Sequence, residues 1–476
     1  MSLTIVASGC SLGPLKHEAS PIDASTLEAA RSVHGIPISA ANWPTAQWWE
    51  AFGDSQLNGL VQEGLSDNPS LGAASARVRQ ASALESAESS FLLPDVTGTF
   101  ASTRQRFSEN GTTPPPIAGT WQTVNQGTLS VRYELDFWGR NRAALDAAIG
   151  RTRAAEVDHY ASEMMLSSAI VQAYLALQAT HDEIDVHDRI LQNQQAVLEL
   201  TQQRYAAQLD SQVDIKQAQA VIPASRASIA ALEEQLELER NALAALLGKG
   251  PDRGRSIDRP RLRLPDTVSL PSSLPAELLG RRPDVVAQRW RVEAAAKDID
   301  VASEAFFPNV NLAAFVGLQS LGFELLDQGS SRILGVGPAF SLPIFDGGRR
   351  RANLAVQNAA YDIAVENYNQ TLVAALRDIA DQMASIRWLQ ARIEQQQLAV
   401  KTAEDAEHLV QQRYAAGLAS YVQVLIAQSA VLTQQRQWVT LQARGLALEA
   451  NLSRALGGGY TPDPAAPSTA ATSSHK

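Results

Sequence analysis

Two periodicities in the chain predict two kinds of secondary structure. The first is an unbroken alternation of apolar and polar residues from Thr128 to Phe137. Side chains of a strand alternate between its two faces, so this stretch predicts a strand with one apolar and one polar face. The apolar face consists of Leu129, Val131, Tyr133, Leu135 and Phe137.

Strands are expected at four places, at about 95–104, 128–137, 309–318 and 333–344. Each is close to the ~9–11 residues that a tilted strand needs to cross a bilayer. Four strands cannot close a transmembrane barrel, because ~8 is the smallest common number and open strand edges are not tolerated in lipid. The barrel is therefore expected to be shared between chains, with the apolar faces toward lipid and the polar faces toward a wet lumen.

The second periodicity is a seven-residue spacing of apolar residues along two long stretches. One series consists of Ile170, Leu177, Ile184, Leu191, Leu198 and Tyr205. The other consists of Ile379, Ile386, Ile393, Val400 and Tyr414, and Glu407 interrupts it. A sustained heptad indicates packed helices with a left-handed supercoil. The first helix is expected from Gly139 to Ala206, which is roughly 100 Å at ~1.5 Å per residue.

The chain contains an internal duplication. The hexapeptide that begins at Gln202 recurs 209 residues later, at Gln411. Each copy predicts a helix, a strand, a loop, a strand, a very long helix, a turn and a helix. The repeats are expected at 56–250 and 273–458, with turns between helices at about 206–213 and 415–421. The remaining segments are a signal remnant at 1–10, equatorial segments at 11–55 and 251–272, and a disordered tail at 459–476.

The composition limits the function classes. A net charge of −10 argues against nucleic acid as a partner. A single cysteine excludes an internal disulfide framework and a cysteine-based zinc site. The seven histidines show no metal-ligand spacing, and no catalytic constellation or phosphate loop is present. No stretch approaches the ~18 consecutive apolar residues of a transmembrane helix. The sequence predicts no enzyme, no metal site and no cofactor.

The first ten residues contain a possible lipid-attachment site. Ala7, Ser8 and Gly9 stand directly before Cys10, as in a bacterial lipoprotein signal, in which the cysteine is acylated. Such a signal also has a basic region and an apolar core of ~7–15 residues. Only nine residues precede Cys10 and none is basic, so either the true start lies upstream or the similarity is accidental. We expect Cys10 to be the lipid anchor.

The motifs of the chain resemble one known family. They are Trp48-Trp49-Glu-Ala-Phe52 with Asp54, Leu57 and Leu60; Tyr133-Glu-Leu-Asp-Phe-Trp-Gly-Arg140; Arg281-Arg-Pro-Asp284 with Ala305-Phe-Phe-Pro308; and Leu342-Pro-Ile-Phe-Asp-Gly-Gly-Arg349. The chain resembles the outer membrane factors, the TolC-like channels of Gram-negative tripartite efflux systems, and most closely their NodT/OprM-like lipoprotein branch. This resemblance implies a mainly α fold with a transmembrane β part: a trimeric 12-stranded β-barrel continued by a long periplasmic α-helical barrel.

The resemblance also implies partners and a function. The partners would be two further copies of the chain, a periplasmic adaptor, an inner-membrane pump (commonly of the RND type) and outer membrane lipid. The expected function is a passive exit duct for drugs or other small toxic compounds. An exit duct for a type I secreted protein is an alternative with the same fold. A structural envelope coiled coil that transports nothing is an alternative from another class.

The resemblance assigns the two turns to the periplasmic tips of the channel. The residues expected to contact the adaptor are Arg204, Tyr205, Arg413, Tyr414 and Gly417. The residues expected near the pore are Asp210, Asp214, Gln423 and Ile426. In three-fold symmetry Asp210 and Asp214 would form acidic rings, whose mutual repulsion can favour cations or a pH-dependent gate. The alternative for both is helix capping. Family members often carry an acid where this chain has Gln423-Val-Leu-Ile426.

Overall fold

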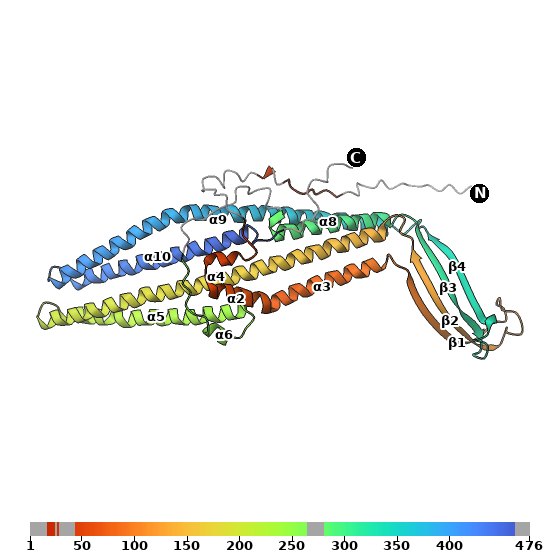
Figure 1. Cartoon of the computed structure of the whole chain (residues 1–476), viewed down its shortest axis with the longest axis horizontal. Helices are drawn as coiled ribbons and strands as arrows, with labels where there is room; N and C mark the ends of the chain where they lie inside the picture. Colours follow the sequence, from red (N-terminus) through yellow and green to blue (C-terminus); the bar gives the residue numbers. More distant parts are fainter. Residues whose placement is uncertain (1–16, 24–25, 28–42, 264–279, 462–476) are drawn as a thin grey trace. The chain divides into compact units, whose positions relative to one another are not determined.

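The fold is described from a computed structural model of the whole chain (Figure 1). The structure describes residues 17–23, 26–27, 43–263 and 280–461, so Cys10 and most of the tail at 459–476 lie outside the described residues. The main elements are α2 (Ser55–Asp67), α3 (Pro69–Ser90), β1 (Asp95–Arg106), β2 (Trp121–Glu134), α4 (Arg140–Ala206), α5 (Gln212–Leu246), α6 (Asp252–Arg255), α8 (Pro283–Glu304), β3 (Asn309–Leu321), β4 (Arg332–Ser341), α9 (Arg349–Ala415) and α10 (Tyr421–Ala455).

The chain forms two compact units. Among the described residues, the first comprises 17–21, Arg77–Glu156 and Ala287–Asn369, and contains the β-sheet. The second comprises Ile22–Ala76, Val157–Val286 and Gln370–Lys476, and contains the turns that join α4 to α5 and α9 to α10. The two longest helices, α4 and α9, have 67 residues each, in agreement with the duplication. Within the described residues, no helix combines the length and the apolar character needed to cross a membrane.

The sheet of the first unit has four antiparallel strands in the order β1-β2-β3-β4. Leu129 lies opposite Val316, and Val316 lies opposite Leu334, so these three side chains share one face. They are exposed by 49%, 56% and 77% respectively. On the other face the hydroxyls of Thr99 and Thr128 lie 2.7 Å apart in a hydrogen bond. One face of the sheet is therefore apolar and exposed, and the other carries polar side chains.

The strands differ from the expected ranges at their ends. β2 ends at Glu134, so Leu135 and Phe137 lie outside the strand. The reason is the start of α4: the Asp136 carboxylate accepts hydrogen bonds from the backbone N–H groups of Asn141 and Arg142 and turns the chain into the helix. The Asp346 carboxylate accepts hydrogen bonds from the N–H groups before and within the first turn of α9, and β4 ends at Ser341 instead of about residue 344.

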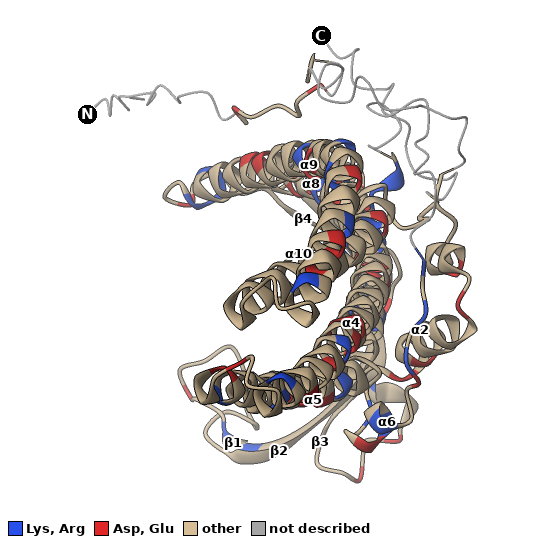
Figure 2. Ribbon diagram, turned by 90° about the vertical axis from the view of Figure 1, so that its left-hand side faces the viewer, with Lys and Arg blue, Asp and Glu red and all other residues tan. Residues whose placement is uncertain are grey.

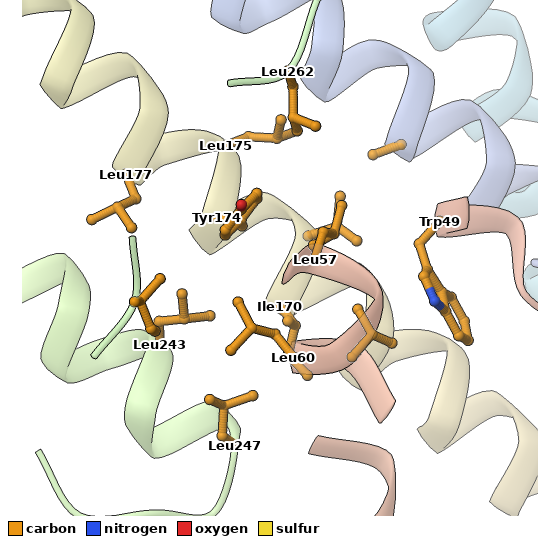
Figure 3. Close-up of a cluster of buried hydrophobic side chains, with 14 of the residues drawn as sticks. Trp49, Leu57, Leu60, Ile170, Tyr174, Leu175, Leu177, Leu243, Leu247 and Leu262 are labelled. Carbon is orange, nitrogen blue, oxygen red and sulfur yellow. The ribbon is translucent and has the colours of Figure 1, made fainter. Parts of the chain in front are cut away.

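The main core lies in the second unit, where α2, α4 and α5 meet (Figure 3). Its fully buried residues include Leu57, Ile170, Tyr174, Leu177 and Leu243. Ile170 and Leu177 are successive members of the first heptad series, and both point into this cluster. The first two members of the heptad series therefore lie on the packed side of α4, whereas Tyr205, its last member, is exposed.

Candidate functional site at the helical tips

The first tip is the turn between α4 and α5. The chain leaves α4 through Gln208, which has a positive φ of 59°, and the N–H of Leu209 donates to the carbonyl of Arg204 at 2.9 Å. Ser211 then caps α5: its N–H donates to the Asp214 carboxylate at 2.9 Å, and its hydroxyl accepts from the Asp214 N–H at 3.4 Å. This reciprocal capping box satisfies donors that a helix start otherwise leaves unpaired.

The second tip, between α9 and α10, repeats this backbone. Gly417 takes the place of Gln208 with a φ of 78°, and the N–H of Leu418 donates to the carbonyl of Arg413 at 2.7 Å. Ser420 caps α10 together with Gln423, whose Oε1 accepts from the Ser420 N–H at 3.1 Å. A left-handed residue after a helix is a common way to end it, and glycine adopts that conformation without strain.

A group of side chains joins the two tips, and we call it the tip clamp: Thr201, Arg204, Asp210 and Tyr414. The Arg204 guanidinium donates to both Asp210 oxygens, from Nε at 2.9 Å and from Nη2 at 3.0 Å. Its Nη1 donates to the Tyr414 carbonyl at 2.6 Å. The Tyr414 hydroxyl donates to Asp210 at 2.5 Å and lies 2.8 Å from the Thr201 hydroxyl. The clamp therefore connects α4 and the first turn to the end of α9.

The electrostatics of the clamp keep its pair ionised. Hydrogen bonds to Asp210 raise the pKa of Arg204 above its ordinary value, against the effect of burial. Burial alone would raise the pKa of Asp210, but hydrogen bonds from Arg204 and Tyr414 outweigh it and hold that pKa below its ordinary value. Burial and the bond to Asp210 raise the pKa of Tyr414 to about 12. At neutral pH the clamp consists of a cation, an anion and a neutral phenol.

Apolar packing surrounds the clamp. Tyr414 packs with Val197 of α4, Ala218 of α5, and Tyr421 and Val424 of α10, all of them buried. The guanidinium of Arg204 lies over the Tyr414 ring, 4.6 Å from its centroid. The four helices of the two hairpins therefore meet in one small core, within which the charged pair is largely shielded from water. Shielding strengthens the pair and makes the loss of either partner expensive.

The predicted tip residues fall into two groups. Arg204, Tyr414 and Asp210 are brought together, and the Asp210 carboxylate is occupied by partners of its own chain. The others are not members of the clamp. Tyr205, Arg413, Gly417, Gln423 and Ile426 are exposed, and Asp214 is partly exposed and takes part in the cap of α5.

Sequence reasoning missed Thr201, whose hydroxyl bonds to Tyr414. A signal for it exists in the duplication, because Thr201 corresponds to Val410 at the offset of 209 residues. Asp210 corresponds in the same way to Ala419. Two of the four clamp residues, Thr201 and Asp210, are therefore polar in the first repeat and apolar in the second, whereas Arg204 and Tyr414 have identical residues at the equivalent positions.

Comparisons with known proteins agree with this architecture. Residues 60–249 and 274–458 match the family described as outer membrane efflux protein. Over 473 residues the chain is 31% identical to the multidrug resistance outer membrane protein MdtP of Escherichia coli K12, covering 97% of this chain and 96% of MdtP. It is 37% identical to the fusaric acid resistance protein FusA of Burkholderia cepacia over 363 residues, covering 75% of this chain and 68% of FusA.

Solved structures give the same result. The outer membrane protein VceC of Vibrio cholerae is 39% identical and superposes with a TM-score of 0.83, over 88% of this chain and all of VceC. The CmeC outer membrane channel of Campylobacter jejuni superposes with a TM-score of 0.86 over 94% of this chain and 95% of CmeC, and at 20% identity it supports the fold alone. The chain therefore belongs to the outer membrane efflux protein family, and it is an outer membrane efflux channel and not an enzyme.

Proposed function

We propose that the protein is the passive exit duct of a tripartite efflux system for drugs or other small toxic compounds. An inner-membrane pump of the RND type would supply the energy, and a periplasmic adaptor would connect that pump to the tips. Similarity to MdtP, named for multidrug resistance, and to FusA, named for fusaric acid resistance, supports export of small toxic molecules. The observation that carries the proposal is a small sheet with an apolar exposed face, on a chain whose longest helices have 67 residues each.

We propose that three copies assemble into one channel. In the described part of the chain, β1 and β4 each pair with one strand only, so each leaves an edge of unpaired backbone groups. Such edges are not tolerated in lipid, and pairing β1 of one copy with β4 of the next removes them. Three sheets of four strands would close a 12-stranded barrel, a size within the range of outer membrane barrels. A helical barrel formed by the helices of the three copies would continue it into the periplasm.

The two faces of the sheet would then meet different surroundings. Leu129, Val131 and Tyr133 lie on the apolar face and would contact lipid, whereas Arg132 and Glu134 would face the water-filled lumen. Leu135 and Phe137 follow the strand and would lie at the periplasmic membrane interface. Acylated Cys10 would add a lipid anchor to the barrel.

At the other end, the tips would form the closed periplasmic entrance. The tip clamp holds the first hairpin to the second within one copy, and in the proposed trimer it would keep the entrance narrow. Asp214, Gln423 and Ile426 are the candidates for lining the constriction, because their side chains are not taken up by the clamp. Tyr205 and Arg413 are exposed candidates for contact with the adaptor.

The deciding experiment is the native mass of protein extracted from outer membranes in mild detergent. We expect a trimer for the wild type and for Cys10→Ser, with weaker membrane retention for Cys10→Ser. Drug susceptibility of a host lacking its own channel, with adaptor and pump supplied, tests export. A monomer that stays in solution without detergent would contradict the barrel, and a trimer that restores secretion of a type I substrate but no drug resistance would favour the alternative duct.

A further inference from the structure

The heptad of α9 is broken by a buried acid. Glu407 takes the place of the apolar residue expected between Val400 and Tyr414, and it is only 8% exposed. No lysine or arginine pairs with it among the residues that the structure describes. Removing an ionised carboxylate from water without a cation is strongly unfavourable unless hydrogen bonds compensate for the lost hydration. A residue of this kind in a packed seam requires an explanation.

The partners of Glu407 are neutral amides from two helices. Asn193 of α4 donates from Nδ2 to Glu407 Oε1. Gln411 of α9 donates from Nε2 to the same oxygen at 3.0 Å and to the Asn193 Oδ1 at 3.0 Å. Gln428 of α10 lies close enough to favour the charged carboxylate, although its amide makes no full hydrogen bond among the described residues. We call Asn193, Glu407, Gln411 and Gln428 the polar layer.

Two residues of the polar layer, Glu407 and Gln428, are buried, and the other two, Asn193 and Gln411, are partly buried. Gln428 is 3% exposed, and its two side-chain amide atoms are buried. Burial raises the pKa of Glu407, the bond from Asn193 opposes this, and the charge of Glu404 on the same helix adds to the rise. α4 and α10 supply only uncharged groups to the carboxylate among the contacts described here. The layer therefore depends on hydrogen bonds between α4 and α9, beside which Gln428 of α10 is buried.

The duplication provides an internal comparison. At the offset of 209 residues, Glu407 corresponds to Leu198, which packs against the tip core. The chain therefore uses leucine at this place in one repeat and glutamate in the other. Leucine gives a continuous apolar seam, and replacing buried charged groups by apolar ones is often neutral or stabilising. Buried polar residues in helical seams are best attested as devices that fix register.

We propose that the polar layer is a register latch that holds α9 and α10 against α4 in the closed channel. It lies one heptad before Tyr414 on α9, about 10 Å along the helix from the tip clamp. An apolar seam tolerates small shifts of one helix along another, whereas a shift here would leave a buried carboxylate and amides unpaired. The latch therefore makes the closed arrangement discrete: the helices are either in register or separated.

This inference rests on the proposed duct, because a latch matters only where the helices move. In the proposed duct, opening of the tips would move α9 and α10 relative to α4 and α5, and the hydrogen bonds of the layer join α4 to α9. The charged carboxyl is not needed for export itself. It biases the equilibrium between the closed and open arrangements.

The test uses Glu407→Leu, which copies the first repeat, in the full-length trimer reconstituted into planar bilayers. We expect Glu407→Leu to be at least as resistant to thermal unfolding as the wild type, yet to raise the ratio of open to closed time about tenfold, as expected for the loss of one charge-assisted hydrogen bond. Glu407→Gln retains an acceptor for Asn193 and Gln411 and should restore most of the closed time. Val400→Leu, one heptad earlier in the same seam, is the matched control and should leave gating unchanged.

A second variant keeps the inference testable if Glu407→Leu does not assemble. Asn193→Leu removes the layer from the side of α4 and should increase the open time in the same direction. Wild-type channels that conduct and export, combined with Glu407→Leu and Asn193→Leu channels that gate normally, would overturn the latch and leave the duct intact. Wild-type protein that forms no channel would overturn the duct itself.

Discussion

The two tips have the same backbone and different side-chain contacts. Arg204 and Arg413 occupy equivalent positions 209 residues apart. Arg204 is buried and donates to Asp210 twice and to the far hairpin. Arg413 is exposed and, within the described part of the chain, donates only to the Leu418 carbonyl of its own turn, at 3.3 Å. The second tip has Ala419 where the first has Asp210. The repeated sequence thus determines the shape of the turn. The positions that differ between the repeats determine which turn forms side-chain contacts with the other hairpin.

The two tyrosines show the same asymmetry. Tyr414 is fully buried and holds Asp210 and Thr201, whereas Tyr205, its equivalent, is 45% exposed. Each tip therefore contributes a different half of the connection: the first hairpin supplies the charged pair and the second supplies the tyrosine. Both long helices also differ at the next heptad position, with Leu198 in one and Glu407 in the other. α9 and its partners carry the polar connections in both layers.

Most charged side chains of the long helices differ from the Arg204–Asp210 pair in their exposure to water. Figure 2 shows Lys and Arg interspersed with Asp and Glu along α4 and α9, among many uncharged residues. Most ion pairs of such a surface are exposed and contribute ~0–1 kcal/mol each. The pair of Arg204 and Asp210 differs because both side chains are less than a tenth exposed. Substitutions in this pair should therefore have larger effects than substitutions elsewhere on the helices.

The largest effect is expected from Asp210→Ala. The change leaves the Arg204 guanidinium buried without its carboxylate and removes the acceptor of the Tyr414 hydroxyl, so the tip should lose about 3 kcal/mol of local stability. Hydrogen exchange of the backbone amides around the two turns measures this loss directly, and planar-bilayer recordings should show a channel that is open more of the time.

Arg413→Ala is the matched control for this substitution. Its single hydrogen bond at 3.3 Å is exposed, so exchange at the second turn should change by no more than about 0.5 kcal/mol. If Asp210→Ala and Arg413→Ala lowered the local stability of the turns equally, the clamp would not stabilise the first tip more than the exposed Arg413 stabilises the second.

An intermediate effect on the closed state of the tip is expected from lowering the pH. The pKa of Asp210 in the folded tip lies below its ordinary value of 3.8. A carboxyl of this kind stabilises the fold fully above its ordinary pKa and loses that contribution as the pH falls through the folded value. The closed state of the wild type should therefore weaken only below about pH 4.

Recordings at pH 7 and at pH 3.5 test this window, with Asp210→Asn as the comparison. The asparagine variant cannot titrate at this position, so its clamp should be weaker at pH 7 and should change less on acidification. A wild-type tip that weakens between pH 7 and pH 5 would point to another titrating group.

The order of strands, long helices and turns could be predicted from the sequence. The alternation, the heptads and the duplication indicated the four strands, the two very long helices and both turns, because each depends on a local period or a local cap. The left-handed role of Gly417 and the capping alternative for Asp214 follow from neighbouring residues, and the structure contains both. The starts and ends of strands were less predictable: β2 begins at Trp121, before the regular alternation starts.

The contacts of the clamp could not be predicted in the same way. Asp210 and Tyr414 are 204 positions apart, and whether a carboxylate at a turn faces a pore or a neighbouring helix depends on the rotation of four packed helices. A seven-residue period gives the packed side of each helix but not which residue of another helix stands opposite. The capping alternative was also incomplete for Asp210, which binds Arg204 and leaves the capping to Asp214.

The smallest effect concerns the residue at the left-handed position of each turn. Gln208 has a φ of 59°, a left-handed conformation that strains a residue with a Cβ, and Gly417 holds the equivalent position without strain. Gln208→Gly should therefore stabilise the first tip by about 0.5–1 kcal/mol, and Gly417→Ala should destabilise the second by a similar amount. A Cβ at Gly417 would meet only the Arg204 Nη1, at 3.8 Å, so strain and not crowding sets this value. Amide exchange at the two turns measures both changes; a Gln208→Gly tip no more stable than the wild type would mean that the Gln208 side chain offsets its backbone strain.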